Sequence, residues 1–180
     1  YPNLLTVEAV RGYENVTFTQ KDADKEAEFC TVLPYARNVF DPMDYTPINL
    51  YKNPSNVQRK TSGAFQLALS VLFTSGLQHF AESPEGMAKV PANVQAYVKT
   101  IPTNWDDIKF IDGVPGEFAV IERRLRPPGR GQANIVAANM LIDVTRHRIG
   151  VGTLEHATAI TQQATVHGQG TLFFIMCRRA

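Results

Sequence analysis

The sequence has 180 residues, of which 44% are hydrophobic and 19% are charged, and its formal net charge is +1 at pH 7. This balance is typical of a folded globular chain and excludes a disordered tail, and so small a net charge does not favour nucleic-acid binding. No apolar run approaches the ~20 residues of a membrane span, and two cysteines are too few for a disulfide framework. The first residues contain no basic segment, so no signal peptide is predicted in them.

The first predicted element is a strand over residues 4–10, whose sequence is LLTVEAV. Glu8 and Glu14 then lie at or just beyond the end of this strand. Gly12, between them, permits a tight bend or a close approach of another backbone. The pattern therefore places two carboxylates together at one strand end.

Residues 21–28 carry mixed charges and predict an exposed helix with a solvated face. The next residues, 29–33, include β-branched and aromatic side chains and predict a short buried strand. Residues 34–47 (PYARNVFDPMDYTP) then predict a rigid, polar loop, because three prolines restrict its backbone. Such a loop after a strand can present a sugar or phosphate site, or it can be a surface turn with a solvated Arg–Asp pair.

A long helix is predicted over residues 62–82, capped by Thr61 or Ser62 and apolar on almost every side. Such a helix is buried, so His79 within it is predicted to be a hydrogen-bonded core residue. Residues 83–85 (SPE) combine a cap, a proline and an acid, which indicates the start of a helix. A further short helix is predicted near residues 92–99.

Strand, loop and buried helix form the repeating unit of a (β/α)8 barrel, and two such units are predicted here. A complete barrel needs about 250 residues, so the pattern indicates the closing part of one. From residue 108 to 124 the sequence instead predicts strand, Gly-Pro-Gly turn and strand. We therefore predict an α/β chain with barrel residues in 1–102 and part of an antiparallel β domain in 103–180.

The residues suggest two uses for the carboxylates Glu8, Glu14, Asp41 and Asp44. Glycoside hydrolysis needs a protonated acid and a second carboxylate, and calcium binds several carboxylate and carbonyl oxygens. Acidic residues at strand ends are also common on ordinary surfaces. Trp105 can stack on a sugar or anchor an interdomain surface.

The sequence resembles glycoside hydrolase family 97, the bacterial α-glucosidases and α-galactosidases, from residue 1 to about residue 124. The resemblance rests on several motifs in the same order. These are residues 6–14 (TVEAVRGYE, similar to the family's REGVRGxE), 33–39 (LPYARNV) with 42–47 (PMDYTP), 75–84 (SGLQHFAESP), 102–106 (PTNWD) and 113–124 (GVPGEFAVIERR).

This resemblance implies a calcium-dependent glycoside hydrolase acting on α-glycosidic bonds of an oligosaccharide or α-glycoside. By resemblance, Glu14 is the general acid, Glu8 and Glu14 lie at the calcium ion, and Arg37, Asp44 and Tyr45 contact the substrate. The resemblance also implies a periplasmic or secreted parent protein. It does not distinguish glucosides from galactosides as substrates, or an inverting from a retaining reaction.

The chain also departs from the family pattern. Val7 stands where the family has arginine, and the second catalytic carboxylate comes from segments that precede Tyr1 in the family. After Arg124 the resemblance stops, so residues 125–180 are either a divergent end or a shifted reading frame. The alternatives to a hydrolase segment are a carbohydrate-binding remnant that uses Trp105, Tyr35 and Tyr45, and an incomplete chain that is inactive alone.

Overall fold

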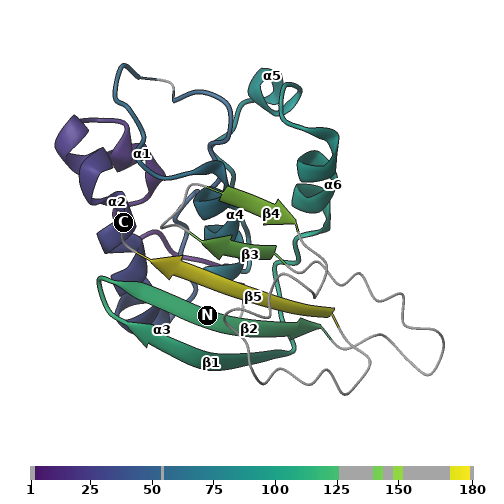
Figure 1. Ribbon diagram of the computed structural model, residues 1–180. Helices are drawn as coiled ribbons and strands as arrows, with labels where there is room; N and C mark the ends of the chain where they lie inside the picture. The colour runs from purple at the N-terminus through teal and green to yellow at the C-terminus, as the bar shows by residue number, and fades with distance from the viewer. Residues whose placement is uncertain (1–2, 54, 126–139, 144–147, 152–170, 179–180) are drawn as a thin grey trace.

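Helices occupy the first hundred residues of the chain, and strands follow them (Figure 1). The computed structural model describes residues 3–53, 55–125, 140–143, 148–151 and 171–178, with side chains up to Arg123. The elements are α1 (Tyr13–Val16), α2 (Gln20–Val32), η1 (Leu33–Tyr35), α3 (Arg37–Phe40), α4 (Gly63–Leu72), α5 (Pro84–Met87), α6 (Ala92–Thr100), β1 (Asp107–Val114), β2 (Phe118–Leu125), β3 (Met140–Asp143), β4 (Arg148–Val151) and β5 (Thr171–Arg178).

Helix α2 begins at a side-chain cap, because the Thr19 hydroxyl accepts a hydrogen bond from the Asp22 amide at 3.2 Å. The helix predicted over residues 21–28 is confirmed, but the strand predicted over residues 29–33 is wrong. Those residues finish α2 and begin η1. Their apolar side chains are used from a helix, with Cys30 fully buried, because a short apolar run does not by itself distinguish a strand from a buried helix.

Helix α4 begins as predicted, with the Ser62 hydroxyl accepting from the Phe65 amide at 3.1 Å, and every residue from Ala64 to Leu72 is buried. The prediction that it continues to residue 82 is wrong. Phe73 adopts an extended backbone, and the chain stays non-helical until α5. Ser83 caps α5, and α6 forms where a short helix was predicted.

Three non-helical segments lie beside one another, and a single parallel bridge joins two of them. Val7 and Met43 form a parallel bridge, and the Asp44 amide donates to the Val7 carbonyl at 3.1 Å. On the other side, the Met43 amide donates to Thr74 and the Ala81 amide donates to Pro47, both at 2.9 Å. Segments 4–8, 42–47 and 74–82 are therefore neighbours, with α2 between the first two in the chain and α4 between the last two. The strand predicted over residues 4–10 is reduced to this isolated bridge at Val7, and the (β/α)8 barrel stays a prediction.

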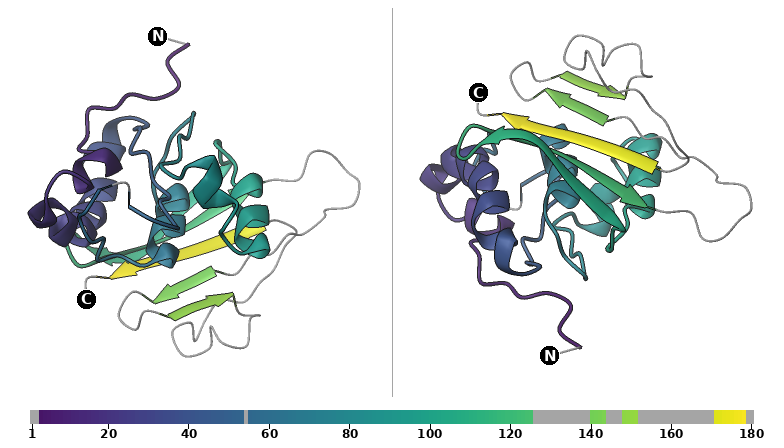
Figure 2. Two further views of the ribbon diagram at one scale, coloured as in Figure 1. Left: turned by 90° about the horizontal axis from the view of Figure 1, so that it is seen from above. Right: turned by 90° about the horizontal axis from the view of Figure 1, so that it is seen from below.

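The predicted hairpin over residues 108–124 is confirmed as β1 and β2, joined at a turn where Gly116 has a φ of +84°. Strand β5 pairs antiparallel with the other edge of β2, and β3 and β4 form a separate two-stranded sheet. Helices α2 and α4 lie against β5, so the helices cover one face of this sheet (Figure 2). His147, His156, His167 and most of the region after residue 125 lie outside the described residues.

One hydrophobic cluster joins the helices to the hairpin, because Ala119 and Ile121 of β2 belong to it together with most of α4. The buried Arg123 strengthens this junction: its guanidinium donates to the Val71 and Leu72 carbonyls at 2.6 and 3.0 Å and to the Thr74 hydroxyl at 2.9 Å. The boundary near Thr103 stays a prediction. In the described part of the chain, no helix is both long and apolar enough to cross a membrane.

Candidate functional site

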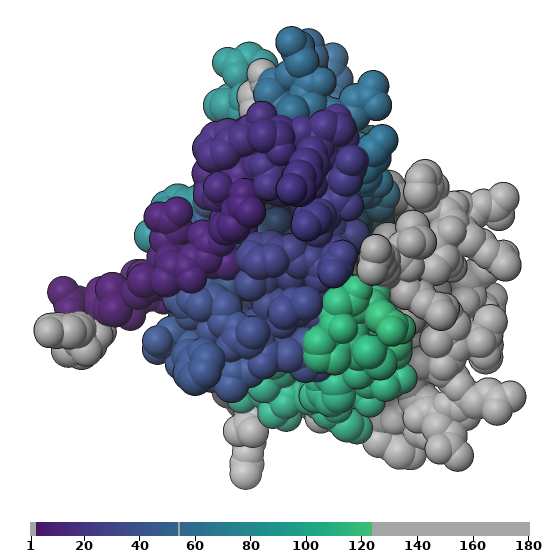
Figure 3. Space-filling model, turned by 90° about the vertical axis from the view of Figure 1, so that its left-hand side faces the viewer, coloured from purple at the N-terminus to yellow at the C-terminus, as the bar shows by residue number. Residues whose placement is uncertain are grey.

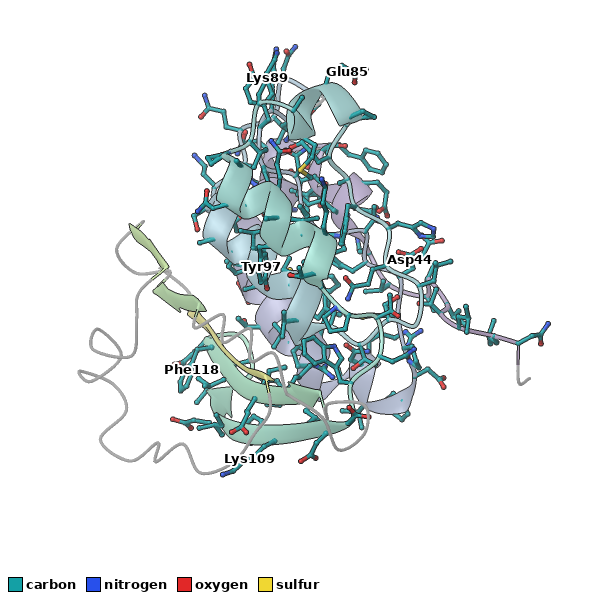
Figure 4. All side chains as sticks on the ribbon, turned by 90° about the vertical axis from the view of Figure 1, so that its right-hand side faces the viewer. Asp44, Glu85, Lys89, Tyr97, Lys109 and Phe118 are labelled. Carbon is teal, nitrogen blue, oxygen red and sulfur yellow. The ribbon has the colours of Figure 1, made fainter. Side chains whose placement is uncertain are left out.

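Alternating residues of segment 42–47 face opposite ways. Met43 and Tyr45 are 1% exposed, and the Tyr45 ring meets Phe73 edge to face with 5.0 Å between ring centroids. Because successive side chains of an extended backbone point to opposite sides, Asp44 faces away from α4, and the Thr46 hydroxyl contacts its carboxylate. We call the side of the three segments that carries Glu8, Asp44, Thr46 and His79 the open face. In Figure 4 the labelled Asp44 lies on the side from which the N-terminal residues project, and Figure 3 shows these residues extending away from the body of the molecule.

The pair of Asp44 and His79 is the main polar contact of the open face. The Asp44 Oδ2 atom lies 2.7 Å from His79 Nδ1, and Oδ1 accepts from the Thr46 hydroxyl at 3.1 Å. The His79 side chain is 55% exposed, so the prediction of a hydrogen-bonded core histidine inside a helix is wrong about its place. Sequence reasoning missed this pair because residues 73–82 were assigned to a helix, although Ser75 and Gly76 already indicated a break.

Glu14, the predicted general acid, is an exposed residue of the short helix α1. The Tyr13 amide donates to the Tyr45 carbonyl at 2.8 Å, which holds the start of α1 against the end of segment 42–47. A β carbon on Gly12 would lie 2.9 Å from that carbonyl and 2.5 Å from Glu14 Oε2, so the predicted close backbone approach at Gly12 is confirmed. Glu14 therefore lies where segments 4–8 and 42–47 both end, and Glu8 is exposed on the first of them.

Backbone strain marks the same ends of these two segments. Ala9 has a φ of 38°, Thr46 of 53° and Ile48 of 67°, all in the left-handed region that favours glycine. Each such residue costs about 1–3 kcal/mol, and strained residues of this kind concentrate at active and ligand-binding sites. Ala9 follows Glu8 directly, and Thr46 lies two residues after Asp44. The strain therefore surrounds the predicted functional carboxylates.

Arg37 holds the two segments together through their backbone. Its guanidinium donates to the carbonyls of Ala9 at 3.2 Å, Val7 at 3.2 Å and Asp41 at 3.0 Å. These bonds fix the positions of the chain around Glu8 and Asp44, so the structure gives Arg37 a positioning contact. Its predicted contact with the substrate stays a prediction.

Tyr45, predicted to contact the substrate, lies in the core. The Cys30 thiol donates to its hydroxyl at 3.1 Å, and burial raises the pKa of the Tyr45 hydroxyl well above 10.0. These contacts give Tyr45 a packing role, and its predicted contact with the substrate stays a prediction. The Tyr35 hydroxyl donates to the Phe118 carbonyl at 3.2 Å, and Trp105 packs against the core, so both aromatic residues also support packing.

Calcium was expected at Glu8 and Glu14. Carboxylate oxygens are ligands that calcium prefers, but it takes six to eight oxygens. Among the described residues, no group of three or more His, Cys, Asp or Glu side chains could hold a metal ion. Calcium at Glu8 and Glu14 stays a prediction.

Comparison with known proteins bears on this arrangement. The chain is 35% identical over 123 residues to a probable retaining alpha-galactosidase of Streptomyces bingchenggensis, and 32% identical over 132 residues to a retaining alpha-galactosidase of Bacteroides thetaiotaomicron. These matches cover 68% and 69% of the chain but 18% and 20% of the relatives. The chain thus spans about a fifth of the length of these curated relatives. No family model matches the chain.

Solved structures are similar over the same share of the chain. A beta-arabinopyranosidase has 37% identity and a TM-score of 0.66, with 69% of this chain and 21% of that one covered. A variant of a glycoside hydrolase family 97 enzyme from a Pseudoalteromonas strain, in complex with panose, has 28% identity and a TM-score of 0.55. That match covers 73% of this chain and 20% of the other.

The strained end that carries the carboxylates lies where a β/α barrel places its active site. The similar proteins are glycoside hydrolases, so this chain is a segment of a glycoside hydrolase. The chain belongs to glycoside hydrolase family 97 over the part that these relatives match.

Proposed function

We propose that the protein carrying this segment is a retaining glycoside hydrolase for α-galactosides and pyranosides of the same stereochemistry. Both curated relatives are named retaining alpha-galactosidases, and the similar structure with 37% identity is a beta-arabinopyranosidase. The neighbours in complex with panose and with acarbose make an α-glucoside the second candidate substrate. In this proposal the three neighbouring segments are part of a (β/α)8 barrel, and the open face is turned toward its interior.

The position of Glu14 is the observation that carries the proposal. This exposed carboxyl group lies at the joint end of segments 4–8 and 42–47, where α1 is held to the Tyr45 carbonyl. Active sites of β/α barrels lie at the carboxyl ends of the strands, where loops bring catalytic groups over the barrel. The resemblance of residues 6–14 to the family motif assigns the acid to this same residue.

In the proposed reaction, protonated Glu14 gives its proton to the glycosidic oxygen as the bond from that oxygen to the anomeric carbon breaks. A carboxylate from another segment forms a bond to the anomeric carbon, which gives a covalent glycosyl enzyme. Water then displaces that carboxylate, and ionised Glu14 takes the proton that water loses. The chain would supply the acid, and the nucleophile would come from elsewhere, so the 180 residues alone are expected to be inactive.

We propose a calcium site whose ligands come partly from this chain and partly from other segments of the protein. Glu8 would supply one carboxylate, with Glu14 beside it, and the remaining oxygens would come from other segments. Bound calcium would supply positive charge near the leaving group. Activity should then be lost in excess chelator and return with added calcium, whereas activity that survives chelation would remove Glu8 from this role.

The test of the acid is Glu14→Gln in the longer protein. Hydrolysis of methyl α-galactoside should fall by about 10²–10⁴-fold, because a positioned general acid contributes that much. Hydrolysis of an α-galactosyl fluoride, whose leaving group needs no proton, should fall far less. Equal losses on both substrates would contradict the assignment. Parallel assays with the matching α-glucosides decide between the two candidate substrates.

A further inference from the structure

Each oxygen of the Asp44 carboxylate has a side-chain partner on the open face. One oxygen accepts from His79 Nδ1 at 2.7 Å and the other from the Thr46 hydroxyl at 3.1 Å. The Asp44 amide is held as well, because it donates to the Val7 carbonyl at 3.1 Å. These contacts fix the position of the Asp44 carboxylate, and the carboxylate in turn orients the imidazole ring beside it.

The ring of His79 has the opposite character, since one side is fixed and the other is open. Its Nδ1 atom is directed at Asp44, and its side chain is 55% exposed. Within the described residues, Nε2 has no hydrogen-bond partner. A carboxylate that accepts from Nδ1 fixes the ring's orientation and leaves Nε2 to accept a hydrogen bond when neutral or donate one when protonated. Either form can bind a hydroxyl group.

The segment that carries His79 is held in place rather than loose. The Ala81 amide donates to the Pro47 carbonyl at 2.9 Å, and the Ser75 hydroxyl contacts the Thr6 hydroxyl at 3.1 Å. An ordinary exposed ion pair contributes little to stability, about 0–1 kcal/mol, so stability alone does not explain a pair that strained backbone at Thr46 helps to position. Groups fixed before a ligand arrives are what a binding site requires.

We propose that His79 binds a hydroxyl group of the pyranoside through Nε2, and that Asp44 is the residue that positions it. The class of substrate in this inference rests on the proposed function. Asp44 was predicted to contact the substrate, whereas here His79 makes the contact and Asp44 orients it. The contact would favour sugars with a hydroxyl at that place, because a sugar without one does not form the hydrogen bond to Nε2.

Two substitutions separate binding from packing in the full-length protein. His79→Asn keeps an amide near the position of Nδ1, so it can still donate to Asp44, but it has nothing at the position of Nε2. His79→Gln reaches the position of Nε2 and cannot reproduce the contact of Nδ1 as well. A role in sugar binding makes the Asn variant the worse one, whereas a role limited to packing makes the Gln variant the worse one.

Calorimetric titration with D-galactose and with methyl α-D-galactoside gives the dissociation constants, and steady-state assays give KM and kcat. We expect His79→Asn to raise the dissociation constant and KM about tenfold, the effect of one lost hydrogen bond, with kcat within about threefold of the unsubstituted value. His79→Gln should change both by less than about threefold. The ¹⁵N resonance of Nε2 in the unsubstituted protein should shift when D-galactose is added, which tests the contact without a variant.

The inference is overturned if the unsubstituted protein binds neither sugar, if the Nε2 resonance does not move at saturation, or if the Gln variant binds more weakly than the Asn variant. The proposed function fails separately. Equal losses for Glu14→Gln on both leaving groups, together with sugar binding that depends on His79, would leave a sugar site without the proposed acid.

Discussion

The two sides of segment 42–47 differ in what covers them. Met43 and Tyr45 are 1% exposed beneath α4, whereas Asp44 and His79 retain side-chain exposures of 22% and 55%. Apolar contacts dominate the covered side, and hydrogen bonds between side chains dominate the open face. This six-residue segment thus serves both the core and the candidate site. Substitutions at neighbouring positions should therefore affect stability in one case and function in the other.

The largest expected effect on stability is on the covered side. Tyr45→Ala should lower the free energy of unfolding by about 3–5 kcal/mol, because it empties a packed site beside Phe73. Asp44→Asn, one residue away, should lower it by less than about 1 kcal/mol, as for an exposed pair. Urea denaturation of the two variants measures both. Similar losses would mean that the two sides do not differ as described.

A smaller loss is expected at the junction of α4 with β2. Arg123→Met leaves the Val71 and Leu72 carbonyls and the Thr74 hydroxyl without their donor, and should cost about 3 kcal/mol. Burial lowers the pKa of the Arg123 guanidinium to about 10, which reflects how little water reaches it. Arg123→Lys, which keeps the charge but not all three bonds, should lose less. An unchanged unfolding midpoint in the Met variant would exclude the junction as a source of stability.

Glu26 should give the covered side a dependence on pH. It is 2% exposed and accepts from the Thr61 hydroxyl at 2.7 Å and the Gln66 amide at 2.6 Å. Burial raises its pKa above 4.5, although these two bonds and Arg59 oppose the rise. The folded protein therefore holds the proton more tightly than the unfolded chain does. The stabilisation from Glu26 is fully present below its pKa in the unfolded chain. It is lost as pH rises through its pKa in the folded protein.

Glu26→Gln should remove this fall. The difference in unfolding free energy between the Gln variant and the unsubstituted protein should grow in favour of the variant as pH rises above 4.5. Urea midpoints at a series of pH values measure it. A constant difference would show that Glu26 has the same pKa in both states.

The smallest effect is expected on the open face. Leu77 is 46% exposed, so Leu77→Ala should change the free energy of unfolding by no more than about 0.5 kcal/mol. Leu69→Ala, the matched change in α4, should cost about 2–5 kcal/mol because Leu69 is fully buried. A large loss at Leu77 in the longer protein would show that other segments cover the open face there.

Local signals in the sequence were reliable where they depend on a few neighbouring residues. Ser62 and Ser83 cap the helices they were predicted to cap, and the hairpin β1–β2 has its turn at Gly116. Gly12 lies where a side chain would collide with the Tyr45 carbonyl. Caps and turns follow from the hydrogen bonds and backbone freedom of single residues, so a sequence can specify them.

Short apolar runs were less informative. Residues 29–33 favoured a strand and form the end of α2, and residues 73–82 favoured a helix and form an extended segment. Neither run is long or regular enough to distinguish a helix from an extended segment by its pattern alone. Packing against α4 and pairing with segment 42–47 decided the outcome, because contacts between distant segments outweigh weak local preferences.

The sequence by itself determined the family motifs, the carboxylates Glu8, Glu14 and Asp44, and the caps and turns, since these depend on residue type and close spacing. Only the tertiary structure decided that Tyr45 belongs to the core, that Arg37 ties two backbones together and that His79 meets Asp44 across 35 positions of sequence. Such contacts form when segments that are separated by a whole helix in the chain lie side by side. Which residues then share a face depends on how the segments align, and the local sequence does not specify this alignment.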